Sequence, residues 1–269
     1  MHKNGGRRIN RRILLISVAL TMVALIVGAA AIMSARMAYT IPILMYHSID
    51  YNDKSSKLSV SPENFARQME FLYKNRYNVV SLEKAVSYIK NKERPPRKTV
   101  AITFDDGFQN NYQYVYPLLK RYKMPATLFV IVNRIGDPGF VTWDEVREMS
   151  DSGIITIGSH TKTHFWLLGS DEHFLKNEVE ESKKILEEKL GRKVNSFCYP
   201  MGAFDAKSKK AVEAAGYMCA VSTNPKNSAP DDIFAIKRVK ISRSSNNLLT
   251  FWAETTKYYT WFKQHKETE

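Results

Sequence analysis

The chain has 269 residues, 44% of them hydrophobic, and a formal net charge of +13. This length and composition fit one large globular domain with a full core and exclude a disordered chain. Residues 1–36 hold six basic and no acidic residues, which leaves a moderate +7 for the rest of the chain. That excess suits an anionic cell envelope or membrane surface. We expect no nucleic-acid partner, because the sequence has no basic helix and no aromatic RNA-binding signature.

The first element expected along the chain is an apolar helix. Residues 13–33 carry no charge, and as a helix this stretch is long enough to cross a bilayer. Because basic residues precede this run, we expect 1–12 to be a cytoplasmic segment, 13–35 a transmembrane anchor, and 40–269 an extracellular domain. A cleaved signal peptide is the alternative, since residues 31–35 include small side chains near a possible cleavage site.

Strands and helices then alternate along the chain. Strands are expected at residues 41–47, 79–80, 99–104, 126–131, 154–158, 196–199, 219–222 and 239–241. Helices are expected from 62 onward and at 81–89, 112–123, 143–151, 171–190 and 205–215, with a last helix within 248–262 that covers the domain. This alternation indicates parallel βαβ units. About seven such units favour a closed or nearly closed (β/α) barrel, preceded by the single transmembrane helix.

Two adjacent carboxylates, Asp105 and Asp106, follow the strand expected at 99–104. The carboxyl ends of parallel strands are where α/β proteins hold their active sites. Neighbouring side chains of a strand point to opposite faces, so both carboxylates reach one site only where the strand ends, and Gly107 allows that turn. A bound cation would relieve the repulsion between them. A solvated turn explains the pair equally well.

A second group, His160 and His164, follows the strand expected at 154–158. Two histidines four residues apart fall on one side of a helical turn and can bind one metal ion, although ordinary surface turns have the same spacing. Together with an aspartate at the end of another strand, they would form a set of three ligands. Such a set leaves coordination positions open for water and substrate, as in catalytic metal sites.

Three segments with their order and spacing carry a family resemblance: Thr103–Gly107, Ser159–His164 and Phe197–Gly202. On these segments the chain resembles the polysaccharide deacetylases of carbohydrate esterase family four, over roughly residues 40–245. The resemblance implies a distorted (β/α) barrel and the removal of N-acetyl groups from an N-acetylglucosamine polymer.

The resemblance also implies roles for individual residues. Asp106, His160 and His164 would hold a divalent metal, usually zinc and sometimes cobalt or nickel. Asp105 would be the general base that deprotonates the attacking water, and the backbone N–H of Tyr199 would stabilise the oxyanion. The chemistry agrees, since one carboxylate must bind the ion while the other stays free to take a proton.

The chain departs from the family at two positions. Many members have an orienting arginine where this chain has Cys198. Arg238 is the candidate replacement, although an ordinary surface arginine accounts for it equally well. Many members also take the general acid from a Leu-x-His motif near the C-terminal end, and residues 237–242 contain no histidine.

By elimination among the six histidines, His47 is the candidate acid. It ends the first strand, which neighbours the last strand in a barrel, and an imidazole suits protonation of a leaving amine. A histidine that merely packs the barrel rim is the alternative. The poly-β-1,6-N-acetylglucosamine deacetylases resemble this chain in having Tyr-His after the first strand and a segment like Thr142–Asp144.

Aromatic residues offer surfaces for sugar rings. Tyr46, Trp143 and Trp166 are candidates for substrate binding, although most aromatic side chains belong to the core. The two cysteines, Cys198 and Cys219, are expected to be separate buried thiols, with a disulfide as the alternative.

The leading hypothesis is a single-pass membrane protein, expected to be monomeric, whose extracellular domain deacetylates an N-acetylglucosamine polymer with a metal ion. The β-1,6-linked exopolysaccharide is favoured because of the His47 arrangement. Peptidoglycan or chitooligosaccharides are alternative substrates, as is a small acetylated molecule. A catalytically silent cell-envelope sugar-binding protein is the alternative of another class, and the four intact Asp and His residues argue against it.

Overall fold

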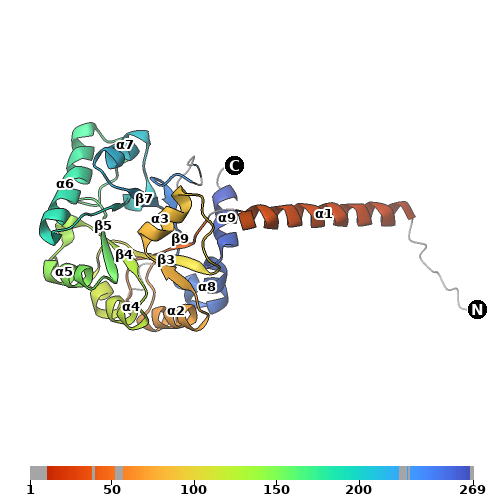
Figure 1. Ribbon diagram of the computed structural model, residues 1–269, viewed down its shortest axis with the longest axis horizontal. Coiled ribbons are helices and arrows are strands. Elements are labelled where there is room, and N and C mark those ends of the chain that lie inside the picture. Colours follow the sequence, from red (N-terminus) through yellow and green to blue (C-terminus); the bar gives the residue numbers. More distant parts are fainter. Residues whose placement is uncertain (1–10, 38–39, 52–56, 224–228, 230, 267–269) are drawn as a thin grey trace, which may run out of the picture. The chain divides into compact units, whose positions relative to one another are not determined.

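The computed structural model describes residues 11–37, 40–51, 57–223, 229 and 231–266. The chain divides into two compact units, Met1–Ala38 and Tyr39–Glu269. The first unit contains helix α1 (Arg11–Met37), drawn in red in Figure 1. Its stretch Ile13–Ala30 is long and apolar enough to span a membrane, and a signal sequence would pass the same test.

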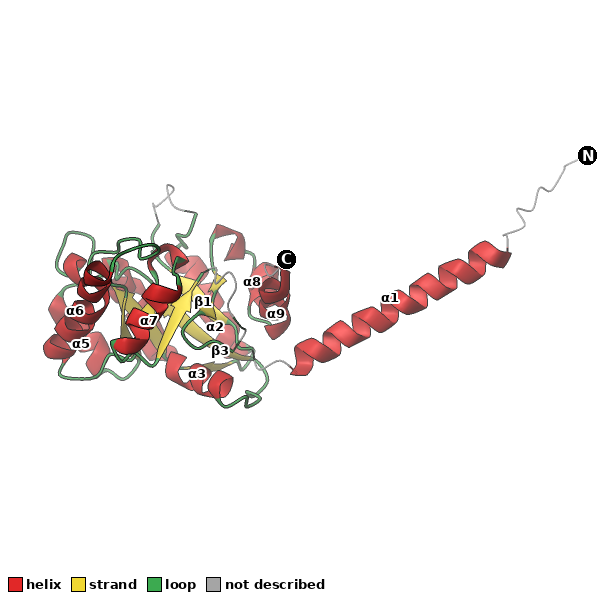
Figure 2. Cartoon of the chain, turned by 90° about the horizontal axis from the view of Figure 1, so that it is seen from above, coloured by secondary structure: helices red, strands yellow, loops and turns green. Residues whose placement is uncertain are grey.

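The second unit is built on a parallel sheet. Its strands are β1 (Ile43–Tyr46), β2 (Asn78–Val80), β3 (Thr99–Phe104), β4 (Ala126–Val130), β5 (Ile155–Ser159), β6 (Ser196–Cys198), β7 (Cys219–Ser222), β8 (Ile236–Lys237) and β9 (Val239–Lys240). The order is β8-β7-β6-β5-β4-β3-β1-β9, with β2 beside β3 off this path. Figure 2 shows these strands in yellow, enclosed by helices.

A single short segment nearly closes the sheet into a barrel. β8 pairs with β7, and β9 pairs with β1 at the opposite end of the path. Only Arg238 separates β8 from β9, so residues 236–240 join the two edges of the sheet. The predicted (β/α) barrel is confirmed, with eight strands along the path where about seven were expected. The additional short strand is β8.

The helices follow the strands in the expected alternation. They are α2 (Pro62–Lys74), α3 (Leu82–Lys90), α4 (Tyr116–Tyr122), α5 (Trp143–Asp151), α6 (Glu172–Leu190), α7 (Ala206–Ala214), α8 (Leu248–Glu254) and α9 (Lys257–Lys266). Ser61 and Ser81 cap α2 and α3 as predicted, each accepting a backbone N–H of the first turn.

Two helical predictions differ from the structure. The helix expected at 112–123 begins with a π-helical turn, Asn111–Val115. The single C-terminal helix is two helices, because the hydroxyls of Thr255 and Thr256 donate to the carbonyls of Trp252 and Ala253. Such side-chain bonds compete with the helical backbone pattern and end α8 here.

The core has an outer and an inner part. Along β1, Leu44 and Tyr46 belong to the apolar layer between the strands and the surrounding helices, whereas Ile43 belongs to a second cluster. This second cluster gathers residues from most strands together with the apolar face of α3, so it fills the barrel interior. Side chains near the carboxyl ends of the strands are polar instead, including buried Asp105, His160 and Arg238.

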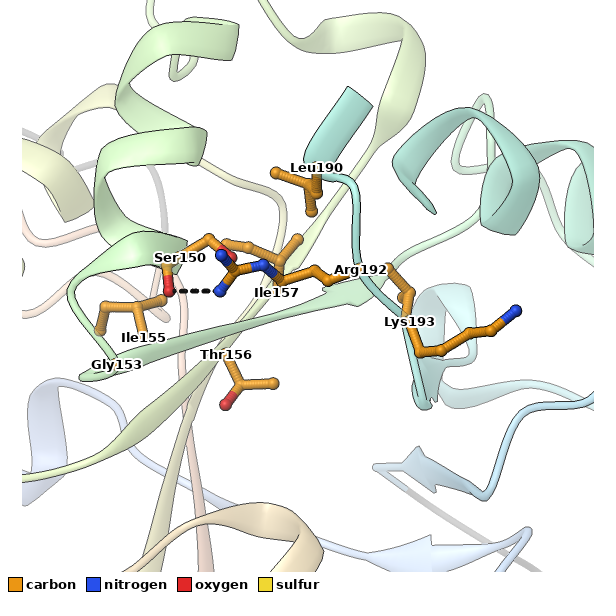
Figure 3. Close-up of a pocket in the computed structure, with 9 residues that line it drawn as sticks. Ser150, Gly153, Ile155, Thr156, Ile157, Leu190, Arg192 and Lys193 are labelled. Atoms are coloured by element: carbon orange, nitrogen blue, oxygen red, sulfur yellow. Dashed lines mark hydrogen bonds between the residues drawn. The ribbon is translucent and has the colours of Figure 1, made fainter. Parts of the chain in front are cut away.

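A small cavity of about 150 Å³ lies beside the amino end of β5 (Figure 3). Arg192 reaches into it and donates to the Ser150 carbonyl oxygen at 2.9 Å, and it also pairs with Asp151. The cavity's lining has no cluster of nucleophilic or metal-binding side chains. The candidate chemistry therefore lies at the other end of the barrel.

Candidate active site

A larger cavity, of about 670 Å³, opens at the carboxyl ends of the strands. Its lining includes nine charged or imidazole side chains: His47, Lys57, Asp105, Asp106, His160, His164, Lys237, Arg238 and Lys240. The barrel thus brings together residues that lie up to 193 positions apart in the sequence, as the alternation of strands and helices predicted.

The turn after β3 directs both aspartates toward this cavity. Asp105 still follows the strand, since its N–H donates to the Tyr46 carbonyl oxygen at 3.0 Å. Asp106 has φ 75° and Gly107 φ 81°, so the left-handed turn begins at Asp106 itself. A side chain at position 107 would meet Val130 at 3.1 Å, and the conformation would also be strained. The predicted end of the strand at this point is confirmed.

Asp105 is held by a buried arginine. Arg238 Nη1 and Nη2 each donate to one carboxylate oxygen of Asp105 at 2.6 Å. The Arg238 side chain is fully buried and also donates to Thr103 Oγ1 and Cys198 Sγ, both at 3.1 Å. Burial alone would raise the pKa of Asp105, but the charge and hydrogen bonds of Arg238 hold it well below its usual range. This geometry excludes the ordinary surface arginine.

Asp106 instead faces the two histidines. Its Oδ1 lies 3.5 Å from His160 Nε2 and 3.6 Å from His164 Nε2, and the three potential ligand atoms lie within 4.8 Å of one another. His160 Nδ1 lies 2.8 Å from the Cys198 carbonyl oxygen. A carbonyl only accepts, so Nδ1 carries the proton and the Nε2 lone pair is directed toward Asp106. The three side chains form a possible metal site.

Protonation supports the same conclusion. Burial lowers the pKa of His160 to about 3 and also lowers the pKa of His164, so both imidazoles are neutral. Burial raises the pKa of Asp106 to about 6, and the nearby His47 and Arg238 offset this effect only in part. Two neutral imidazoles and one carboxylate are a donor set that suits a divalent ion such as zinc. The residues therefore fit the ion.

The His160–His164 segment is not the helical turn that its spacing predicted. Thr161 and His164 have φ 67° and 63°, and the segment is irregular. The His164 N–H donates to Thr161 Oγ1 at 2.9 Å, and the Thr161 N–H donates to Ser159 Oγ at 3.2 Å. These local bonds replace the helical ones and turn the chain back, so that the two imidazole rings lie 4.7 Å apart.

Glu178 supports this loop and was not found from the sequence. Its carboxylate, on α6, accepts the N–H groups of Lys162 and Thr163 at 3.1 and 2.9 Å and the Thr163 hydroxyl at 2.8 Å. Glu178 is 1% exposed. The sequence contains a signal, because Glu178 stands between Leu175 and Val179 on the buried face of α6, where an apolar residue is expected.

His47 lines the cavity on the side of Asp105. Its Nε2 lies 3.8 Å from Asp105 Oδ2, and its side chain is 18% exposed. The buried Nδ1 has no hydrogen-bond partner among the residues that the structure describes. The imidazole is thus close to the predicted base and open to the cavity. Its role as the acid stays a prediction.

The prediction for Tyr199 is wrong. The Tyr199 N–H donates to the Val221 carbonyl oxygen at 3.1 Å as part of the β6–β7 ladder, so it cannot bind an oxyanion. Two residues further, Met201 lines the cavity with φ 55°. Within the described part of the chain, no hydrogen bond of the Met201 N–H is found. The sequence signal for this position is the Pro200-Met201-Gly202 turn, which was expected only to shape the loop.

None of the three aromatic candidates is among the residues that line the cavity. Tyr46 is fully buried and its hydroxyl donates to Gln68 at 2.9 Å, so the prediction that it stacks on sugar is wrong. Trp143 is half-buried, packs against the core and lies beneath Lys189, and it does not line the cavity. Trp166 is 41% exposed and is also absent from the lining, so its role stays a prediction.

Both cysteines are buried and free, which confirms two separate thiols. The Cys198 Sγ lies in the candidate active site, 3.7 Å from Asp105 Oδ2, and accepts a hydrogen bond from Arg238 Nη2. A small thiol thus stands where many members have the arginine, and Arg238 reaches Asp105 from the segment between β8 and β9 instead.

Comparisons with known proteins agree with this geometry. A family model described as polysaccharide deacetylase matches residues 92–220. YxkH of Bacillus subtilis, provisionally named a polysaccharide deacetylase, is 36% identical over 203 residues, which cover 75% of this chain and 71% of YxkH. The chain therefore belongs to the polysaccharide deacetylases of carbohydrate esterase family four, which are hydrolases of amide bonds.

Two further relatives are informative. The poly-β-1,6-N-acetyl-D-glucosamine N-deacetylase of Staphylococcus epidermidis is 27% identical over 209 residues, which cover 72% of each chain. The Streptococcus pyogenes deacetylase PplD, solved in complex with acetate, matches the fold with a TM-score of 0.72 and 29% identity, covering 78% of this chain and 96% of PplD. The family resemblance and the barrel predicted from the sequence are confirmed.

Proposed function

We propose that this protein removes N-acetyl groups from an extracellular N-acetylglucosamine polymer in a metal-dependent reaction that releases acetate. One observation carries the proposal: two adjacent aspartates in one cavity have different partners. Asp105 is bound by Arg238, whereas Asp106 faces His160 and His164. A carboxylate that could act as the base and a set of residues that could hold a metal would then lie side by side, as amide hydrolysis with a metal requires.

Asp106, His160 and His164 would hold the ion, for which zinc is favoured over cobalt or nickel because of its preference for such a set. When bound, a divalent ion activates water and polarises a carbonyl. Asp105 would accept the proton of the attacking water. Arg238 keeps the pKa of Asp105 below its usual range, so this carboxylate is ionised at neutral pH. It would take a proton only from a water molecule whose own pKa is lowered.

The remaining steps concern the acetyl oxygen and the leaving amine. Water adds to the acetyl carbonyl carbon, the C–N bond breaks, and acetate and a free amine result. We assign stabilisation of the carbonyl oxygen to the Met201 N–H, whose turn faces the cavity. His47, 3.8 Å from Asp105, would give a proton to the amine nitrogen.

The proposed location rests on α1. We assign it as a membrane anchor, with the basic segment before it on the cytoplasmic side, because basic residues are retained there. The barrel would then act on polymer at the extracellular face of the membrane.

The β-1,6-linked polymer is the favoured substrate, and the name of the Staphylococcus epidermidis relative supports it. The test is acetate release by the zinc-loaded, full-length protein from defined β-1,6 and β-1,4 N-acetylglucosamine oligomers. We expect faster release from the β-1,6 series. Faster release from the β-1,4 series would favour peptidoglycan or chitooligosaccharides instead, and release from neither would contradict the proposed function.

A further inference from the structure

Three lysines line the cavity besides the catalytic candidates: Lys57, Lys237 and Lys240. Lys237 ends β8 and Lys240 ends β9, on either side of Arg238. The Lys57 carbonyl oxygen accepts the N–H of Arg243 at 3.3 Å, so Lys57 adjoins the segment that follows β9. The three lysines therefore lie on one side of the cavity, and we call them the lysine rim.

The two exposed lysines of the rim, Lys57 and Lys240, leave the cavity with an excess of positive charge. Asp105 and Asp106 are its only carboxylates among the lining residues that the structure describes. Asp105 neutralises Arg238, and Asp106 belongs to the metal-ligand set. Lys57 and Lys240 are exposed, and across residues 40–51, 57–223 and 231–266 neither forms an ion pair with a carboxylate.

This charge matters because the reaction changes the charge of its polymer. Each turnover converts a neutral acetamide into an amine, which is protonated near neutral pH. A sugar unit beside the scissile one then carries a positive charge if it has already reacted. A positive potential around a cleft repels a polymer segment that carries such a charge. At physiological ionic strength this repulsion acts over about 8 Å.

We propose that the lysine rim makes the site select against polymer units whose neighbours are already deacetylated. The enzyme would then modify separated units and leave the polymer partly acetylated. This inference rests on the proposed function, and it names the charge state of the substrate that the site accepts.

The test compares the full-length, zinc-loaded wild type with the variant Lys57→Glu/Lys240→Glu. Both positions are exposed, so we expect the fold to be retained. Lys184→Glu together with Lys207→Glu, on α6 and α7 away from the cavity, is the control with the same change in net charge. Binding of a fully acetylated and a fully deacetylated glucosamine pentamer is measured by calorimetry at low and high salt.

We expect the wild type and the control to bind the deacetylated pentamer more weakly than the acetylated one. The rim variant should bind the deacetylated pentamer roughly threefold to tenfold more tightly than the wild type does, and high salt should reduce this change. Sequencing of partly reacted polymer should show separated amines with the wild type and runs of adjacent amines with the rim variant.

Equal binding of both pentamers by the wild type would overturn the proposal, as would runs of amines in its product. Tighter binding of an N-succinylated pentamer than of the acetylated one would also overturn it, since the rim would then select an anionic substrate. If no oligomer releases acetate, the proposed function fails, but the binding comparison still decides the role of the rim.

Discussion

Replacing Arg238 by methionine tests how the site holds its base. The guanidinium is fully buried, and its partner Asp105 has a side chain only 3% exposed. Removing the arginine leaves a buried carboxylate without a counter-charge, and breaking a buried pair in this way typically costs about 3–5 kcal/mol of the free energy of unfolding. For a domain of this size we expect the midpoint of thermal unfolding to fall by roughly 6–20 °C.

The assay is thermal unfolding of the full-length protein in detergent with a metal chelator present, together with acetate release by the zinc-loaded form. Arg147→Met is the matched control, because Arg147 pairs with Asp144 at 2.8 Å on the surface and exposed ion pairs contribute little. The double variant Arg238→Met/Asp105→Asn removes both charges, so it should be more stable than the sum of the two single changes predicts.

The stability that the Asp105–Arg238 pair contributes should decrease as the pH falls. The pKa of Asp105 is lowered in the folded protein, so its pair with Arg238 stabilises the fold above the unfolded-state pKa and loses this effect as the pH falls. The gap in stability between wild type and Arg238→Met should therefore be largest at neutral pH and narrow on acidification. An Arg238→Met protein as stable as the wild type at pH 7 would refute this reasoning.

Three further predictions concern the metal and the acid. Glu178→Gln should weaken zinc binding by about tenfold to a hundredfold in a chelator competition assay, whereas Glu188→Gln on the exposed face of the same helix should not. Apparent zinc affinity should rise with pH up to about 6, where Asp106 ionises. Above this pH it should level off, because the ligand histidines are already neutral. If zinc binding released two protons between pH 6.5 and 8, this prediction would be contradicted. His47→Gln should keep its zinc but lose about 10²–10⁴-fold in kcat, and an unchanged kcat would place the acid elsewhere.

The sequence predicted what depends on local periodicity and on strand ends. The apolar run before Asp105 and the glycine after Asp106 sufficed to place two carboxylates at one end of a parallel sheet. The caps at Ser61 and Ser81 marked helix starts correctly, because capping depends only on neighbouring backbone groups.

Features that depend on three-dimensional register were not predictable. Tyr46 directly precedes His47, and the pairing of β1 with β3 and β9 decides which of the two faces the cavity. Tyr46 faces the core. The Tyr199 N–H is taken by β7, a strand about 20 residues further along the chain, and this pairing cannot be inferred from a local motif. Glu178 supports the histidine loop from a different helix, so only its unusual position on an apolar face indicated a role.

The central claim is that the two neighbouring aspartates have different tasks. The most direct test is zinc content and acetate release for Asp105→Asn and Asp106→Asn, measured side by side on the full-length protein. We expect Asp105→Asn to retain one zinc per chain and lose acetate release, and Asp106→Asn to lose both. An Asp105→Asn protein that releases acetate at the wild-type rate, or an Asp106→Asn protein that keeps its zinc, would contradict the assignment.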